Sequence, residues 1–233
     1  MKRVPVVPKS GATVRSLIRE RLKETGRTSQ ELARAIELPE AYIEDVLSGD
    51  RRPPLPDRTD VYERTTRFLR MGRNELADCA TVECKGARDV EAAPPAEVRN
   101  EMLSLCAPET ARALRRRSGR AGEASLIDLF RRLLDVAQGY ARRALTDQIP
   151  LRIAATRNGS DYPETRLRVL DFIEASPSTV TRADLAEFLK PKISSWDVDL
   201  DTGVLRVILR SAESTELHQR RPMTRSRRSR TGG

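Results

Sequence analysis

The chain has 233 residues, which is room for two small domains, and a formal net charge of +9. Charged residues make up 33% of it and aromatic residues only 4%, a composition that favours helical cores of Leu, Ala and Val. No long apolar run is present, and the basic start of the chain lacks the apolar segment of a signal peptide. We therefore expect a cytoplasmic protein without a membrane span, nucleoid-associated if it binds DNA.

The excess of basic residues lies at the two ends of the chain. Residues 1–12 carry a net charge of +3 and residues 218–233 a net charge of +6, while acidic and basic residues balance in between. We expect both ends to be flexible and the tail to attract phosphate groups without sequence preference. The alternative is a tail that only keeps the protein soluble. The tail residues expected to contact phosphate are Arg220, Arg221, Arg225, Arg227, Arg228 and Arg230.

The first predicted helix begins at Val14 and ends at Gly26, a residue type that commonly terminates helices. A second helix is expected directly after Thr28, whose side chain is suited to cap it. Glu31, three residues later, completes the pattern of a capping box.

The next residues have the spacing of a helix-turn-helix. With Ser29 as the first position, the fifth, tenth, fifteenth and eighteenth positions are Ala33, Leu38, Ile43 and Val46. Two short helices that cross steeply need a small residue at the crossing, which Ala33 supplies, and apolar residues hold the second helix in place. The second helix of the motif is expected over residues 39–47.

This stretch resembles the lambda-repressor-like helix-turn-helix proteins, also called the Cro/CI or XRE family. The resemblance covers about residues 14–80, with further helices expected at 61–69 and around Leu76, and it implies a five-helix domain that binds double-stranded DNA. By position it also implies which residues contact DNA: Ser29, Gln30, Glu40, Ala41, Glu44, Ser48, Arg51 and Arg52.

Two features depart from the family pattern. Glu37 stands in the turn, where the family usually has Gly and a positive φ is needed, which costs about 1 kcal/mol or requires a different turn. The presumed recognition helix presents Glu40, Glu44 and Asp45 and contains no Arg, Lys, Asn or Gln. A carboxylate can accept a hydrogen bond from cytosine, but this contact is less common than Arg to guanine. Either this helix reads DNA, or the domain contacts another protein.

A second region follows a Pro- and Ala-rich linker. Short helices are expected at residues 98–105 and from Pro108 onward, and then a long helix over 123–146. Apolar residues recur in the long helix at heptad spacing, which is typical of either a core helix or a helix–helix dimer contact. These residues are Leu126, Phe130, Leu133, Ala137, Tyr140 and Ala144.

The last predicted elements are two helices and a hairpin. The helices are expected at residues 163–175 and 178–189, the second with Thr181 as its N-cap. Alternating residues on both sides of an Asp-Thr-Gly turn predict a β-hairpin over 196–210. Because an isolated hairpin is marginally stable, it packs on the helices or pairs with a partner's edge. Three carboxylates are expected on one solvated strand face: Asp197, Asp199 and Asp201.

Few residues suggest catalysis or metal binding. The only histidine, His218, lies in the basic tail, and no phosphate-binding Gly-rich loop is present. The three cysteines, Cys79, Cys84 and Cys106, lack zinc-finger spacing. Arginine pairs at 131–132 and 142–143 lie on one side of the long helix, as a second phosphate-binding face or an ordinary solvated face. We expect no enzyme activity, no cofactor and no metal.

The predicted fold is mostly α: a five-helix lambda-repressor-like N-terminal domain, then a helical C-terminal region that ends in a β-hairpin. The expected parts are a flexible basic arm (1–12), the helix-turn-helix domain (13–80), a linker (81–97), a helical oligomerisation or effector domain (98–217) and a disordered basic tail (218–233). The function indicated is a sequence-specific DNA-binding transcriptional regulator that acts as a dimer or higher homo-oligomer. The alternative is a helical module whose helix-turn-helix domain contacts another protein.

Overall fold

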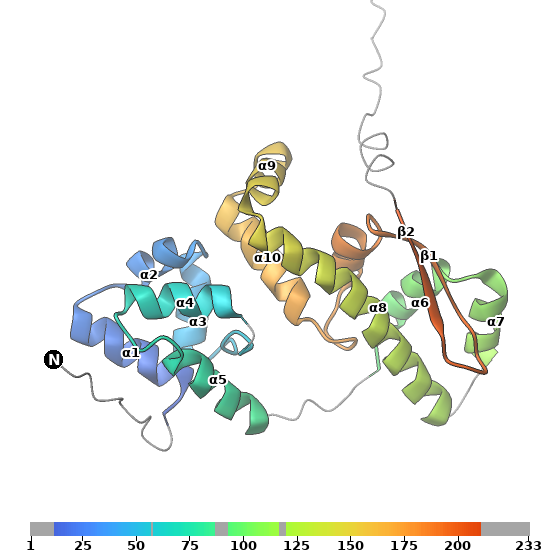
Figure 1. Cartoon of the computed structure of the whole chain (residues 1–233), viewed down its shortest axis with the longest axis horizontal. Helices are drawn as coiled ribbons and strands as arrows, with labels where there is room; N and C mark the ends of the chain where they lie inside the picture. Colours follow the sequence, from blue (N-terminus) through green and yellow to red (C-terminus); the bar gives the residue numbers. More distant parts are fainter. Residues whose placement is uncertain (1–11, 57, 87–92, 117–119, 211–233) are drawn as a thin grey trace, which may run out of the picture. The chain divides into compact units, whose positions relative to one another are not determined.

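The structure is a computed structural model that describes residues 12–56, 58–86, 93–116 and 120–210 (Figure 1). These residues are mostly α-helical, and they include one two-stranded antiparallel sheet near the C-terminal end. The prediction of a mostly α fold with a β-hairpin near the C-terminal end is therefore confirmed. The chain divides into two compact units: Met1–Ala92 with Gln138–Ser178, and Ala93–Ala137 with Thr179–Gly233.

Five helices form the N-terminal part of the first unit (Figure 1): α1 (Val14–Thr25), α2 (Ser29–Ile36), α3 (Glu40–Ser48), α4 (Thr59–Phe68) and α5 (Glu75–Gly86). All five contribute buried side chains to one apolar cluster. The predicted caps of the first two helices are present. Gly26 ends α1 in the left-handed conformation, and Thr28 and Glu31 form a reciprocal capping box at the start of α2. Local sequence therefore sets both ends of the connection between these two helices.

The ends of α4 and α5 differ in detail from the expectation. Helix α4 ends at Phe68, one residue earlier than expected, and Arg70 follows it in the left-handed region at φ 54°. The fifth helix has 12 residues and extends to Gly86, into the segment expected to be linker. The apolar residues Leu76, Cys79 and Ala80 lie at helical spacing on the buried side of its first half.

The first unit also contains α9 (Gln148–Asn158), α10 (Tyr162–Glu174) and the last turns of α8 (Arg120–Thr146). The sequence did not predict α9, because its apolar pattern is weak: Ile149 and Ile153 are exposed. Leu170 of α10 belongs to the same buried cluster as the first five helices. The compact units therefore follow a different division from the predicted one, in which residues 98–217 formed one domain.

The second unit contains α6 (Ala96–Ser104), α7 (Pro108–Arg116) and the first part of α8. It also contains α11 (Arg182–Asp184), which continues into a π-helical turn at Leu185–Leu189, and the strands β1 (Ile193–Val198) and β2 (Leu205–Leu209). Thr181 caps α11 as predicted. The heptad positions of α8 from Leu126 to Ala137 are at most 8% exposed within the single chain. This supports a core helix over a dimer contact, the other interpretation of the heptad pattern.

The hairpin is antiparallel and packs on helices of its own unit. The buried indole of Trp196 donates from Nε1 to the Met102 carbonyl at 2.8 Å. The backbone N–H of Trp196 donates to the Leu105 carbonyl at 3.0 Å, and its carbonyl accepts from the Ala107 N–H at 3.0 Å. These bonds attach β1 to the chain just after α6 on the side away from β2.

The carboxylates of the hairpin do not share one strand face, because β1 ends at Val198 and two of them lie in the turn. The side chain of Asp199 accepts from the backbone N–H groups of Asp201 and Thr202 at 3.0 and 3.1 Å. These bonds hold the pKa of Asp199 below its ordinary value. Asp197 instead accepts a hydrogen bond from the Thr110 hydroxyl. The prediction of a common solvated face was wrong, and Asp199 has a structural role in the turn.

The substitution Ala33→Glu tests the packing between α2 and its neighbours. Ala33 is 3% exposed, so a glutamate there brings an unpaired charge into the core. We expect a loss of several kcal/mol of stability, or a Tm lower by about 10 °C for the full-length protein. The matched control is Ala35→Glu, at an exposed position of the same helix, which should leave Tm nearly unchanged. Equal Tm values for the two variants would contradict this packing.

Candidate nucleic-acid interface

The turn between α2 and α3 has the backbone that the motif requires. Glu37 lies at φ 57° and ψ 48°, in the left-handed region, and its N–H bonds back to the end of α2. Pro39 then precedes the first residue of α3 as its N-cap. The chain thus adopts the left-handed turn with a glutamate rather than a glycine, at a cost of about 1 kcal/mol in backbone strain.

The outward face of α3 is exposed and acidic. Ala41, Glu44, Asp45 and Ser48 are exposed, while Tyr42, Ile43 and Val46 between them are buried. The helix therefore presents one face to solvent and fixes the other in the core. No basic side chain lies on the exposed face.

Gln30, at the start of α2, contacts the start of α3. Its Nε2 donates to Oε2 of Glu40 at 3.2 Å, and both groups lie at the surface. Ser29, the first residue of α2, is half-buried. The amide of Gln30 and the carboxylate of Glu40 are therefore hydrogen-bonded to each other at the surface.

Two arginines of α1 hold the end of α3. Arg15 donates to the Ser48 carbonyl at 3.2 Å, and Arg19 donates to the Leu47 carbonyl. Cations at a helix C-terminus are stabilising because they compensate the helix dipole. Gly49 follows at φ 98°, a backbone conformation that favours glycine. A Cβ there would lie 1.8 Å from Nη1 of Arg15, so a larger residue would also displace this guanidinium.

The loop after α3 is less available for contacts with DNA than the sequence suggested. Arg51 forms an ion pair with Asp171 of α10, and its guanidinium lies 4.7 Å from the centre of the Tyr42 ring. Ser48 donates to the carboxylate of Asp50 at 2.7 Å. Arg52 is exposed. Of the two loop arginines expected to contact DNA, Arg51 is therefore engaged within the protein.

A cluster of three arginines surrounds Glu37, and the sequence analysis did not predict it. Arg64 of α4 donates to the Glu37 carboxylate at 2.5 Å, and Arg152 of α9 donates to its other oxygen. Nη1 of Arg166, on α10, lies 3.8 Å from Oε2 of Glu37. The guanidinium of Arg152 also stacks 4.0 Å over the ring of Tyr162. This one carboxylate therefore joins the turn of the motif to three other helices.

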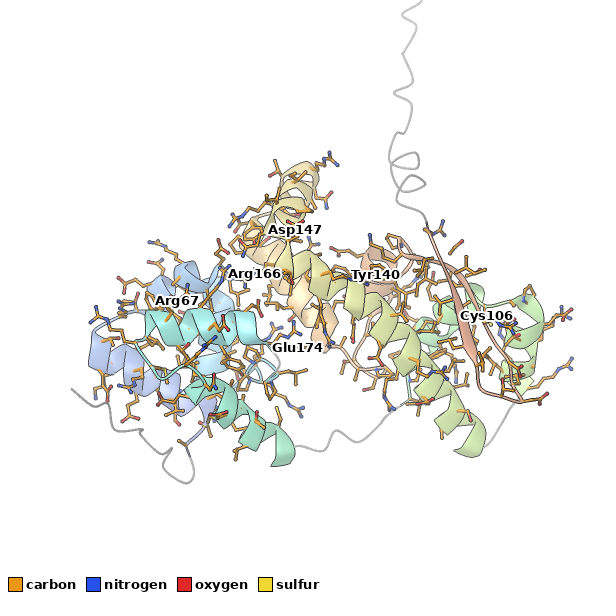
Figure 2. All side chains as sticks on the ribbon, viewed as in Figure 1. Arg67, Cys106, Tyr140, Asp147, Arg166 and Glu174 are labelled. Atoms are coloured by element: carbon orange, nitrogen blue, oxygen red, sulfur yellow. The ribbon has the colours of Figure 1, made fainter. Side chains whose placement is uncertain are left out.

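Arg166 is the buried member of the cluster, with its side chain only 3% exposed (Figure 2). It donates to the Ile36 carbonyl at the end of α2 and to the Asp60 carboxylate at 2.9 Å. Nothing in the local sequence distinguishes this arginine from the other lysines and arginines of the chain, which has 43 in all. Only a contact between segments more than 100 residues apart identifies it.

The arginine pairs of α8 do not form an open basic stripe. Arg131 lies 3.6 Å from the carboxylate of Asp128, and Arg132 donates to the Gly203 carbonyl at 2.9 Å. Arg143 lies over the ring of Tyr140 at 4.5 Å. These neighbours favour the solvated-face interpretation. The basic arm and the six tail arginines lie outside the described residues.

Neither a metal cluster nor a membrane span is found within the described ranges. No group of three or more His, Cys, Asp or Glu side chains there is placed to hold a metal ion. The three cysteines are free thiols, with Cys79 and Cys106 buried and Cys84 exposed. Among the same residues, no helix is both long and apolar enough to cross a lipid bilayer.

Comparisons of the chain with protein-family models, curated proteins and solved structures find no match.

The variant Glu37→Gln tests the arginine cluster and its pH dependence. Burial raises the pKa of Glu37, but the hydrogen bonds and charges of Arg64 and Arg152 outweigh it and hold the pKa below its ordinary value of 4.5. The carboxylate therefore stabilises the fold above pH 4.5, and this stabilisation is lost as the pH falls through the lowered pKa.

We expect Glu37→Gln to cost about 2 kcal/mol at pH 7 and progressively less below pH 4.5, as measured by urea unfolding. Glu63→Gln, at an exposed position on α4, is the matched control and should cost little at either pH. A loss for Glu37→Gln that is the same at pH 7 and pH 3 would show that the charge does not stabilise the fold.

Proposed function

We propose that the first unit is a lambda-repressor-like helix-turn-helix module and that the protein is a sequence-specific, DNA-binding transcriptional regulator. The observation that supports this most directly is the arrangement of α2 and α3, which are joined by a left-handed turn with one face of α3 exposed. The protein would act on the nucleoid as a dimer or higher oligomer, because operator half-sites about 34 Å apart are read by two copies.

The proposed contacts follow from the exposed groups. Ser29 and Gln30 lie at the N-terminus of α2, where the helix dipole favours a phosphate. Ala41 can contact a thymine methyl group, and Glu44 can accept a hydrogen bond from cytosine N4. Glu40 would act through the orientation that it imposes on Gln30.

A protein-interaction module is the second candidate, and the charge of α3 favours it. Three carboxylates on a helix without a basic residue repel a phosphate-lined groove. The pairing of Arg51 with Asp171 removes a cation that would offset them. The same acidic face would fit a basic surface on a partner protein.

Selection from random duplex DNA separates the two candidates. We expect the full-length protein to enrich a palindromic sequence, as judged by sequencing the retained pool. Glu44→Gln should replace a cytosine preference by adenine at one position of each half-site, a discrimination of about 1–3 kcal/mol, because glutamine binds adenine through two hydrogen bonds. Glu63→Gln, on α4, should leave the enriched sequence unchanged. A pool without any enriched sequence would favour the protein-interaction candidate.

Deletion of residues 218–233 tests the proposed role of the tail. This segment carries six arginines and no acid, so it should contribute several counterions to the salt dependence of DNA binding. We expect the deletion to weaken binding to all sequences by similar factors and to flatten the plot of log affinity against log salt concentration. Titrations at three salt concentrations measure this. An unchanged slope would show that the tail does not contact DNA.

A further inference from the structure

The outer edge of β2 is open within the described part of the chain. The sheet there has only two strands, and β1 has a neighbour on both sides because Trp196 also pairs with the segment around Cys106. β2 has β1 on one side only. Exposed, unprotected strand edges are normally avoided in monomeric proteins, which place proline, a bulge or several charges there. β2 contains no proline and one charged residue, Arg206, and the bulge of the sheet lies in β1.

The core face of the sheet continues to this open edge. On β1 the core face consists of Ile193, Trp196 and Val198, all buried. Their partners across the ladder are Leu209, Val207 and Leu205, which are only partly covered. Leu209 is 45% exposed. On the other face Ile208 is 61% exposed. Along β2, the apolar layer of the second unit is therefore only partly covered.

The hydrogen-bonding groups at the edge have a definite pattern. Trp196 directs its N–H toward the Leu105 carbonyl and its own carbonyl toward the Ala107 N–H, both away from β2. The pair Trp196–Val207 is therefore of the non-hydrogen-bonded kind, so Val207 also directs its N–H and carbonyl away from β1. By the alternation of the ladder, the same holds for Leu205 and Leu209. These three residues present their backbone groups at the open edge.

We propose that the occupant of this edge is β2 of a second copy, paired antiparallel about a two-fold axis at Val207. In this register Val207 exchanges two backbone hydrogen bonds with its own copy, and Leu205 lies opposite Leu209 of the second chain. The apolar layer then continues through a four-stranded sheet. On the other face Arg206 lies opposite Ile208 of the second chain, where its aliphatic stem covers the isoleucine.

The charges also select this register. An axis at Arg206 would place this arginine directly opposite its own copy, where the two like charges repel. An axis at Val207 avoids this contact and keeps Asp197 of β1 opposite Arg206 within each chain. The charges therefore favour the register at Val207 over the one at Arg206. This proposal adds a dimer contact to the proposed function, which needs two copies at one operator, but its test contains no DNA.

The first measurement is the mass of the full-length protein at tens of micromolar by sedimentation velocity. The wild type should have the mass of a dimer, and Val207→Lys should halve it, because a lysine at the axis places two like charges together. Ile149→Lys, at a position 70% exposed on α9, is the matched control and should remain dimeric. A monomeric wild type, or a Val207→Lys variant that folds and remains dimeric, overturns the proposal.

The second measurement does not depend on whether the lysine variant folds. Opposed residues at a hydrogen-bonded position lie about 5.5 Å apart between Cα atoms, within the range of a disulfide. In a Cys84→Ser background, Val207→Cys should therefore give a covalent dimer with oxidised glutathione. Val204→Cys, 51% exposed and three residues from the axis, should not. Equal cross-linking of both variants overturns the register.

The chain beyond β2 is the competing occupant of the edge. If residues 211–233 cover it, their deletion converts a monomer into a dimer, and this outcome also overturns the proposal. A dimer that persists after the deletion supports it. Neither result depends on selection of a DNA sequence, so failure of the dimer contact and failure of the DNA-binding proposal are distinguishable.

Discussion

The first unit depends on one buried cation. The guanidinium of Arg166 lies among the end of α2, the start of α4 and the turn residue Glu37, with its side chain 3% exposed. A buried charge is tolerated only where hydrogen-bonding partners replace water, and here the Ile36 carbonyl and the Asp60 carboxylate do so, with the Glu37 carboxylate 3.8 Å away as a further counter-charge. Loss of this side chain would leave the Ile36 carbonyl without its partner and a cavity beside it. Helix α10 thus lies in one unit with α2 and α4, although more than 100 residues of sequence separate the contacting positions.

The arginine cluster also gives a physical reason for the glutamate in the turn. A non-glycine residue at positive φ costs about 1 kcal/mol, which glycine would avoid. Glycine, however, has no carboxylate, and the one on Glu37 binds Arg64 and Arg152 and faces Arg166. Hydrogen bonds between charged groups contribute about 1.5–3 kcal/mol each, so the interactions of the side chain outweigh the strain of its backbone. The side chain of Glu37 thus gives this turn contacts with α4, α9 and α10 that a glycine could not make.

The sequence predicted those features that depend on neighbouring residues. The capping box at Thr28, the left-handed Gly26, the buried face of α8 and the hairpin all follow from short-range patterns, and the structure contains each of them. The exposed face of α3 was predictable for the same reason. Helix α9, the pairing of Arg51 with Asp171 and the cluster around Glu37 were not. Each depends on contacts between segments separated by more than 100 residues, where one arginine cannot be told from another.

The charges of residues 13–80 separate affinity from specificity in the proposed function. Basic and acidic residues balance over this region, and the exposed face of α3 is acidic, so the region has little electrostatic attraction for phosphate. In the proposed function, the carboxylates of α3 would distinguish bases only after the protein has been brought to the duplex. The attraction would then come from the basic ends of the chain, which would contact any sequence equally, and from binding two half-sites at once. A dimer held by β2 would supply the second contribution without any new contact to DNA, because binding of one copy raises the local concentration of the other.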